Sequence, residues 1–216
     1  LLKGGTIEKR PLIWHYPHYG NQGGQPSSII REGDWKLIHY YESGREELYN
    51  LTTDIIETAK EVIEKEARAV QALTNYIDKE FETIVNLIYN SKGRVILTGI
   101  GKSAIIASKI VATLNSTGTA ALFMHAADAI HGDLGMIQPE DVVICISKSG
   151  NTPEIKILVP LIKRRGNTLI AMVSNIESYL AKGADYILKT TIENEACPNN
   201  LAPTSSTTTQ LVLGDA

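Results

Sequence analysis

The chain has 216 residues, of which 43% are hydrophobic and 21% are charged, and its formal net charge is −3. This composition is typical of a globular protein and excludes disordered and collagen-like chains. No run approaches the roughly 18 apolar residues of a membrane-spanning helix, and the slightly acidic charge argues against nucleic-acid binding. The two cysteines lack CxxC spacing, which indicates neither a zinc cluster nor a disulfide framework, so we expect a cytoplasmic protein.

The first part of the chain differs in composition from the rest. Residues 1 to 53 hold both tryptophans and three of the five histidines. The segment 11–16 is β-prone, and the segments 28–31 and 35–41 flank a short turn, which predicts a hairpin. The segment 47–51 follows a second turn. We therefore predict a domain of three or four antiparallel strands without a long helix.

The second predicted domain, residues 54–216, begins with a helical pattern. Apolar residues recur at spacings of three and four from Asp54, which is expected to cap the first helix, and the charge-rich stretch 77–80 is expected to divide the run into two helices. Beyond them, strands alternate with helices. The predicted strands are 94–98, 121–124, 142–146, 168–173 and 186–188, and the predicted helices are 103–116, 153–165 and 178–182.

Alternating strands and helices predict an α/β fold: a doubly wound, five-stranded parallel sheet in a flavodoxin-like αβα sandwich, preceded by the small antiparallel β segment. Ligands of such sheets bind beyond the carboxyl ends of the strands, so the loops there are the places to seek chemistry. The chain begins without Met and stops within a helical pattern, so we expect a fragment that is truncated at its carboxyl end.

The loop after the first strand of this sheet opens a helix. A P-loop requires a Gly separated by four residues from Gly101-Lys102-Ser103, and Ile96 stands at that position, so that interpretation fails. Gly99, Gly101 and Ala104 satisfy the weak dinucleotide pattern GxGxxA. A dehydrogenase and a simple tight turn both remain open at this point.

The loop after the third strand is more informative. Ser147, Ser149 and Thr152 place three hydroxyls ahead of Pro153, which suits the first turn of a helix. Hydroxyls and free backbone N–H groups at a helix start form an anion site, as a sugar phosphate requires. The alternative is a polar capping loop without a ligand.

Histidines and glutamates supply the candidate acid and base groups. His125 and His131 follow the second strand and suit proton transfer near neutral pH, or contact with a sugar hydroxyl or metal, although structural histidines are common. Glu154 and Glu195 are candidate carboxylate bases at the same edge, with a solvated helix-start glutamate as the alternative. The stretch 204–209 is predicted to begin a helix that faces this crevice.

Several motifs together resemble the sugar isomerase (SIS) domain of arabinose-5-phosphate isomerases over about residues 55 to 216. They are GKSA at 101–104, LNSTGT at 114–119, HAADAIHGDLGMI at 125–137, SKSGNTPEI at 147–155 and EACPNNLAPTSSTT at 195–208. The resemblance implies an aldose-ketose isomerase that interconverts D-arabinose 5-phosphate and D-ribulose 5-phosphate, toward Kdo for lipopolysaccharide or capsule. It also implies a homo-oligomer, with a tetramer favoured, a sugar phosphate as ligand and no required cofactor.

Residue roles are implied by the same resemblance. Lys102, His131, Glu154 and Glu195 match catalytic positions. His125 matches a position that binds an inhibitory zinc ion. The implied substrate-binding residues are Gly101, Ser103, Gly118, Thr119, His125, Ser147, Ser149 and Thr152. Isomerisation through an enediol needs an acid-base group and a cation near the oxyanion, and Lys102 can supply the cation.

The chain departs from this family at Lys148, Asn151 and Ala104, where the family usually has Asn, an acidic residue and Gly. The family's HPGG segment would lie beyond Ala216, so we expect impaired activity. Residues 9–51 resemble something else, the carboxyl-terminal subdomain of type I sulfatases, without a sulfatase nucleophile motif. The alternative to an isomerase is a non-catalytic SIS module that binds a sugar phosphate to regulate a partner.

Overall fold

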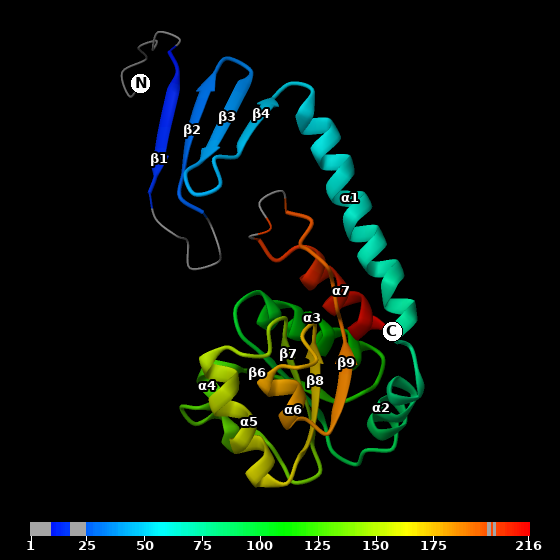
Figure 1. The fold of residues 1–216 in the computed structure, drawn as a ribbon. Helices are drawn as coiled ribbons and strands as arrows, with labels where there is room; N and C mark the ends of the chain where they lie inside the picture. Colours follow the sequence, from blue (N-terminus) through cyan, green and yellow to red (C-terminus); the bar gives the residue numbers. More distant parts are fainter. Residues whose placement is uncertain (1–9, 18–24, 198–199, 201) are drawn as a thin grey trace, which may run out of the picture. The chain divides into compact units, whose positions relative to one another are not determined.

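The computed structural model describes residues 10–17, 25–197, 200 and 202–216 (Figure 1). Its internal contacts divide the chain into two units, one of residues 1–64 and 196–202 and the other of residues 65–195 and 203–216. The first division falls inside the continuous helix α1 (Asp54–Ala72), not at the change of composition near residue 53.

The first unit contains a four-stranded antiparallel sheet. Its strands are β1 (Leu12–Tyr16), β2 (Ser27–Glu32), β3 (Trp35–Tyr40) and β4 (Glu46–Asn50), and they pair in chain order. Each strand overlaps a predicted β segment, so the antiparallel prediction is confirmed. Gly33, at φ +56°, occupies the turn between β2 and β3, where a left-handed residue matches the twist of the hairpin.

The second unit is built on a five-stranded parallel sheet, which confirms the predicted fold class. Its strands are β5 (Val95–Gly99), β6 (Ala121–His125), β7 (Val142–Ser147), β8 (Thr168–Val173) and β9 (Tyr186–Lys189). Their spatial order is β6-β5-β7-β8-β9 and every neighbouring pair is parallel.

Helices of the second unit follow or flank these strands. They are α2 (Lys79–Tyr89), α3 (Lys102–Ser116), α4 (Ala126–Ala129), α5 (Pro153–Arg165), α6 (Tyr179–Gly183) and α7 (Ser205–Asp215). The unit also contains two 3₁₀ turns, Leu73–Tyr76 and Asp133–Met136. Among the residues that the structure describes, no helix has the length and apolarity needed to cross a membrane.

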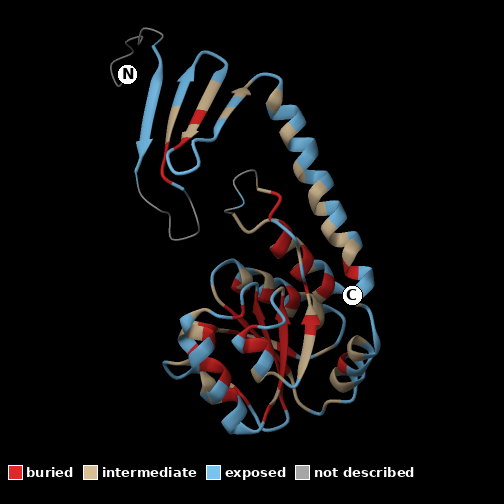
Figure 2. Cartoon of the chain, viewed as in Figure 1, coloured by how far each residue is buried: buried red, intermediate tan, exposed pale blue. Residues whose placement is uncertain are grey.

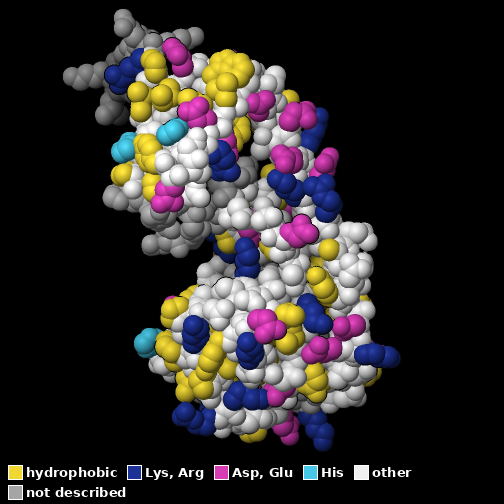
Figure 3. Space-filling view, in the orientation of Figure 1, with side chains coloured by type: hydrophobic (Ala, Val, Ile, Leu, Met, Phe, Trp, Pro, Cys, Tyr) yellow, Lys and Arg dark blue, Asp and Glu magenta, His cyan; other side chains and the backbone are white. Residues whose placement is uncertain are grey.

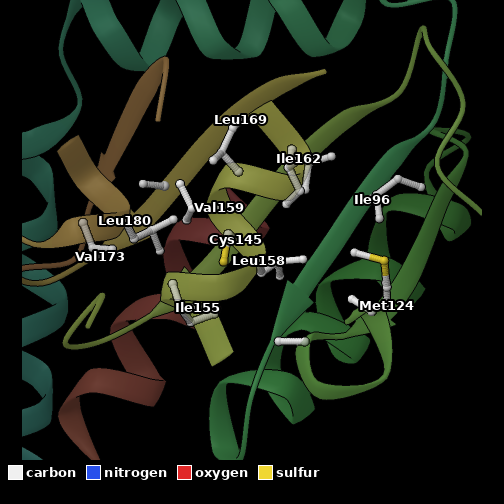
Figure 4. Packing of buried hydrophobic residues seen from close by; sticks show 14 of the residues in the cluster. Ile96, Met124, Cys145, Ile155, Leu158, Val159, Ile162, Leu169, Val173 and Leu180 are labelled. Carbon is white, nitrogen blue, oxygen red and sulfur yellow. The ribbon is translucent and has the colours of Figure 1, made fainter. Parts of the chain in front are cut away.

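Alternate residues of the strands face two separate apolar cores. One core packs Ile155, Leu158 and Ile162 of α5 against strand residues such as Ile96 and Cys145 (Figure 4). The opposite core packs α2, α3 and α7 against the intervening strand residues. Because both faces are covered, the central strands are buried along their length, as Figure 2 shows in red.

The helix starts bear on two predictions. Asp54 is the first residue of α1, and its Oδ2 accepts a hydrogen bond from the N–H of Asn50, which precedes the helix, so its capping of α1 stays a prediction. The predicted break near residues 77–80 is present. There Asp78 caps α2, with its Oδ1 accepting from the N–H groups of Glu80 at 2.9 Å and Phe81 at 3.1 Å.

Candidate functional site

The strand order makes the carboxyl ends of β5 and β7 a topological switch point. The chain leaves β5 toward β6 on one side, and it leaves β7 toward β8 on the other, so the two loops diverge at this point. In doubly wound sheets such a switch point is where ligands bind. Lys102 and Ser103 follow β5, and the hydroxyl-rich segment 147–152 follows β7, as the sequence predicts.

The loop after β7 presents hydroxyls at the start of α5. Ser147 is buried and its Oγ accepts from the N–H of Gly150 at 3.1 Å, whereas Ser149 is exposed and its Oγ accepts from the N–H of Asn151 at 3.3 Å. Thr152 is the residue before the first turn of α5, and its buried Oγ1 has no hydrogen-bond partner among the described residues. A polar atom in that state is suited to a ligand oxygen.

Gly150 fixes the shape of this loop. Its φ of +63° favours glycine, and a Cβ there would overlap Oγ of Ser178. Its carbonyl accepts from the N–H of Leu180 at 3.1 Å, and Oδ1 of Asn151 accepts from the N–H of Tyr179 at 3.0 Å. The family departure at Asn151 therefore joins the loop to the start of α6.

Glu195 is the most enclosed carboxylate of the predicted site, with its side chain 1% exposed. Its Oε1 accepts from Nζ of Lys148 at 2.7 Å and from Oγ of Ser206 at 2.6 Å. Its Oε2 accepts from the backbone N–H groups of Thr204 at 2.9 Å and Ser206 at 3.0 Å. The carboxylate thus joins the β7 loop to the first residues of α7.

These contacts decide the charge of Glu195. Burial alone would raise its pKa, but the hydrogen bonds from Lys148 and Ser206, with the backbone N–H of Thr204, outweigh burial and hold the pKa of Glu195 below its ordinary value. Glu195 is therefore an ionised anchor at neutral pH. The predicted role as a proton-accepting base requires one of these donors to leave.

The loop after β5 also contacts α7. Gly101, at φ +59°, precedes α3, and Lys102 is exposed in its first turn. Figure 3 shows lysine and arginine side chains, in dark blue, spread over the visible face of the second unit. Oγ of Ser103 donates to Oε1 of Gln210 at 3.3 Å. Gln210 is completely buried, and its Nε2 has no partner among the described residues. The first half of α7 thus contacts both loops of the switch point.

The two predicted histidines also lie at the carboxyl edge of the sheet. His125 ends β6 with its side chain 34% exposed, and its Nδ1 lies 3.7 Å from Oδ2 of Asp128. His131 is exposed after α4. No cluster of three His, Cys, Asp or Glu side chains able to hold a metal occurs within the described residues. The zinc site at His125 therefore stays a prediction.

The remaining predicted residues divide between the two edges. Glu154 lies in the first turn of α5 beside the hydroxyl loop and is partly buried. Gly118 and Thr119 lie between α3 and β6, at the amino edge of the sheet and away from the switch point. Their substrate contact stays a prediction, and the fold does not bring them to the other residues within one chain.

Two contacts of this site could not be found by sequence reasoning. Lys148 and Glu195 are 47 positions apart in the hydrogen bond that joins them, and Ser103 and Gln210 are 107 apart. Neither pair belongs to a local motif. The signal for the first was the presence of a lysine where the resembling family usually has Asn, which predicted a changed charge but not its partner.

Taken together, the switch point, the hydroxyl loop and the buried ionic anchor define a doubly wound α/β domain whose carboxyl edge has the groups that suit an anion. Comparison with known proteins gives the family. Residues 87–216 match the SIS domain model, and the chain belongs to the SIS domain family.

Two curated relatives are bacterial enzymes. Over 163 residues, the chain is 49% identical to arabinose 5-phosphate isomerase KpsF of Escherichia coli O6:H1 (strain CFT073), covering 75% of this chain and 50% of the relative. It is 52% identical over 163 residues to arabinose 5-phosphate isomerase KdsD of Pseudomonas aeruginosa (strain PAO1), covering 76% of this chain and 50% of the relative. The chain thus spans about half the length of these curated relatives.

A solved structure agrees with this family. The structure of E. coli CFT073 c3406 in complex with arabinose 5-phosphate is 40% identical, with a TM-score of 0.72, and the match covers 76% of this chain and 87% of that one. None of these comparisons supports the resemblance of residues 9–51 to sulfatases.

Proposed function

We propose that this chain carries the catalytic domain of an aldose-ketose isomerase that interconverts D-arabinose 5-phosphate and D-ribulose 5-phosphate. The observation that carries the proposal is the hydroxyl loop at the switch point, in a chain about half identical to enzymes named arabinose 5-phosphate isomerase. The similar solved structure, a complex with arabinose 5-phosphate, adds support. Arabinose 5-phosphate made in this way would serve the Kdo pathway.

Phosphate binding is assigned to the β7 loop. Ser149 is exposed, Thr152 has an unpartnered Oγ1 among the described residues, and both precede α5, a helix of 13 residues whose amino end favours an anion. A sugar phosphate held here would extend its carbon chain toward the start of α3. Ser103 and the exposed Lys102 lie there.

The isomerisation then moves one proton between neighbouring carbons. A base removes the proton from C2 of the open-chain aldose, the resulting enediol is stabilised by a cation beside its oxygens, and a proton returns to C1 to give the ketose. Glu154, partly buried in the first turn of α5, suits the base, and the exposed Lys102 suits the cation. His131 can carry protons between the oxygens and water. Glu195 holds the start of α7 in place.

A coupled assay of ribulose formation from arabinose 5-phosphate tests this function. It is applied to this chain and to a chimera joined to the remaining half of a KpsF relative. We expect turnover by the chimera and a loss of at least about 100-fold in Glu154→Gln, as for a removed general base. Glu177→Gln, at an exposed glutamate of an ion pair with Lys182, is the matched control. Absence of turnover in the chimera would refute the proposal.

A non-catalytic sugar-phosphate sensor is the second candidate, because the carboxylate of Glu195 is already engaged in hydrogen bonds. A sensor would bind arabinose 5-phosphate in calorimetry without converting it. Binding together with turnover decides for the enzyme.

We also propose a homo-oligomer, with a tetramer favoured. Helix α1 has no buried residue, and Ile55, Ile56 and Ile63 are 60%, 58% and 69% exposed, which leaves apolar side chains for a second copy. Sedimentation of the wild type against Ile63→Glu tests this, and an unchanged monomeric mass in both would contradict it.

Three further expectations remain proposals. Zinc inhibition through His125 predicts that His125→Ala resists added zinc. Residues 9–51 are proposed to be a sulfatase-type subdomain without sulfatase activity, supported by the antiparallel order of β1 to β4. Hydrolysis of an aryl sulfate would contradict that view. A cytoplasmic location, supported by a buried thiol at Cys145, is tested by cell fractionation.

A further inference from the structure

Lys148 holds an unusual position between the proposed phosphate loop and the buried carboxylate of Glu195. Its ammonium lies 2.7 Å from Oε1 of Glu195, yet its side chain is 45% exposed while that of Glu195 is 1% exposed. Its backbone belongs to the loop that presents Ser149. One residue therefore reaches both the hydroxyl loop and the anchor of α7.

Among the donors to Glu195, Lys148 is the one best able to leave. The N–H groups of Thr204 and Ser206 are fixed by the backbone at the start of α7, and Ser206 is 1% exposed. The lysine side chain is long, has several rotatable bonds and carries three donors on its ammonium. A movement of Nζ would expose one lone pair of Oε1 without disturbing the helix.

Other charged groups at this edge lie on other elements. They include Lys102 at the start of α3, Glu154 in the first turn of α5, His125, Asp128 and His131 at and beyond the end of β6, and Glu193 after β9. The first turn of α7, which packs directly on Glu195, contains no acidic or basic residue. Lys148 is therefore the cation that joins Glu195 to the loop after β7.

We propose that a phosphate group bound at the β7 loop draws the ammonium of Lys148 away from Glu195, so that ligand binding and protonation of Glu195 are coupled through Lys148. Lys148 is thereby a positioning residue whose ammonium makes protonation of Glu195 less favourable in the free protein than in the complex with a dianion. This inference rests on the proposed phosphate site but not on turnover. By linkage, whatever the dianion does to the protonation of Glu195, protonation does to dianion affinity by the same factor.

The test is a pH titration of the Glu195 carboxyl carbon by NMR, with the signal assigned through Glu195→Gln. Sulfate serves as the probe, since it remains dianionic across the range in which carboxylates titrate, and chloride at equal ionic strength is the reference. Lys148→Met removes the charge while keeping the chain length. Lys182→Met, at an ion pair with Glu177 elsewhere, is the matched control.

We expect sulfate to raise the midpoint of the Glu195 titration by about one pH unit or more in the wild type and in Lys182→Met, as the loss of an adjacent cation does. In Lys148→Met the midpoint is already raised without sulfate, and sulfate adds little. A midpoint that sulfate leaves unchanged in the wild type would overturn the proposal. So would an equal rise in Lys148→Met, because the effect would then bypass the lysine.

The outcome is separable from that of the enzyme assay. If the chimera does not convert arabinose 5-phosphate but the titration midpoint of Glu195 responds to sulfate through Lys148, the isomerase proposal is refuted and the coupling stands. If the chimera turns over its substrate but the midpoint does not respond to sulfate, the isomerase proposal stands and the coupling is refuted. Lys148→Arg gives an independent check, since it restores a cation and is expected to recover most of the response.

Discussion

Replacement of Glu195 by Gln isolates the energetic contribution of the ionic anchor. Gln has the same size, but it brings one acceptor oxygen and one NH₂ donor to a place that now holds a carboxylate. Either orientation of the amide sets its NH₂ against the ammonium of Lys148 and Oγ of Ser206, or against the backbone N–H groups of Thr204 and Ser206. At least two charge-assisted hydrogen bonds are lost.

Each such bond contributes about 1.5–3 kcal/mol. The loss at Lys148 is discounted because its half-exposed ammonium regains water. We therefore expect a destabilisation of about 3 kcal/mol, which corresponds to roughly 6–12 °C in the melting temperature of a unit of this size.

The pH dependence of this difference has a definite sign. The pKa of Glu195 in the folded protein lies below its ordinary value of 4.5, because the hydrogen bonds to the carboxylate outweigh its burial. A lowered folded pKa contributes stability that is present above the unfolded pKa and lost as pH falls through the folded pKa. The gap between wild type and Glu195→Gln should therefore be full at pH 7 and narrow below about pH 4.5.

Thermal unfolding followed by far-ultraviolet circular dichroism measures this gap, since the described helices begin at residue 54. Tryptophan fluorescence reports separately on the first unit, where Trp14 and Trp35 lie. A helical transition at pH 7 that is unchanged in Glu195→Gln, or a gap that widens in acid, would refute the assignment of Glu195 as an ionised anchor.

Three other substitutions follow from the same structure. Gly150→Ala should cost about 2–4 kcal/mol, because Ala must adopt a left-handed φ and its Cβ would meet Ser178. A melting temperature within about 2 °C of wild type, by the same size scaling, would contradict this. Burial raises the pKa of the Cys145 thiol to about 12, so in a Cys197→Ala background Cys145 should not react with a maleimide at neutral pH until denaturant is added. Rapid labelling of the native protein would contradict the burial of Cys145. Leu158→Ala should cost about 2–5 kcal/mol in urea unfolding, since Leu158 is completely buried, and a smaller loss would indicate a loosely packed core.

Most of the fold was predictable because its signals are local. The strand 168–173 and the helix 153–165 have the predicted bounds in the structure, since a run of buried β-branched and apolar residues and a Pro-initiated helix are each encoded within one short segment. The contact of Asp54 with Asn50 was not predictable in this way. A carboxylate at a helix start can accept from an N–H before it or after it, and the sequence does not tell which residue supplies the donor.

The site was predictable only as far as its residues follow strands. Ser147 and Lys102 lie at or just after the ends of β7 and β5, so a parallel sheet brings them to one edge. Strand order was less predictable than the strands themselves, because the β6-β5-β7 arrangement depends on which core each helix fills and is not encoded in any single segment. The pairing of Lys148 with Glu195 depends on that order, on the loop held by Gly150 and on the place of α7.

The two edges of the parallel sheet differ in the kind of buried polar atom that is left without a hydrogen-bond partner. At the amino edge, the buried carboxylate of Asp141 accepts hydrogen bonds from the backbone and guanidinium of Arg94, which fixes the starts of β5 and β7. The buried atom left without a partner at that edge is an acceptor, Oδ1 of Asn167, which would repel an anion.

Toward the carboxyl edge, the corresponding atoms of the described residues are two hydroxyls, Thr98 Oγ1 of β5 and Thr152 Oγ1, and an amide donor, Gln210 Nε2. The half-exposed ammonium of Lys148 lies at the same edge. Buried polar groups without partners are unfavourable. The unsatisfied groups at this edge can donate hydrogen bonds, and a cation lies beside them. A ligand rich in acceptor oxygens would therefore remove the unfavourable free energy of leaving these donors without partners. A phosphate ester is such a ligand, so this difference in the kind of unsatisfied atom supports the phosphate site that we propose at the carboxyl edge.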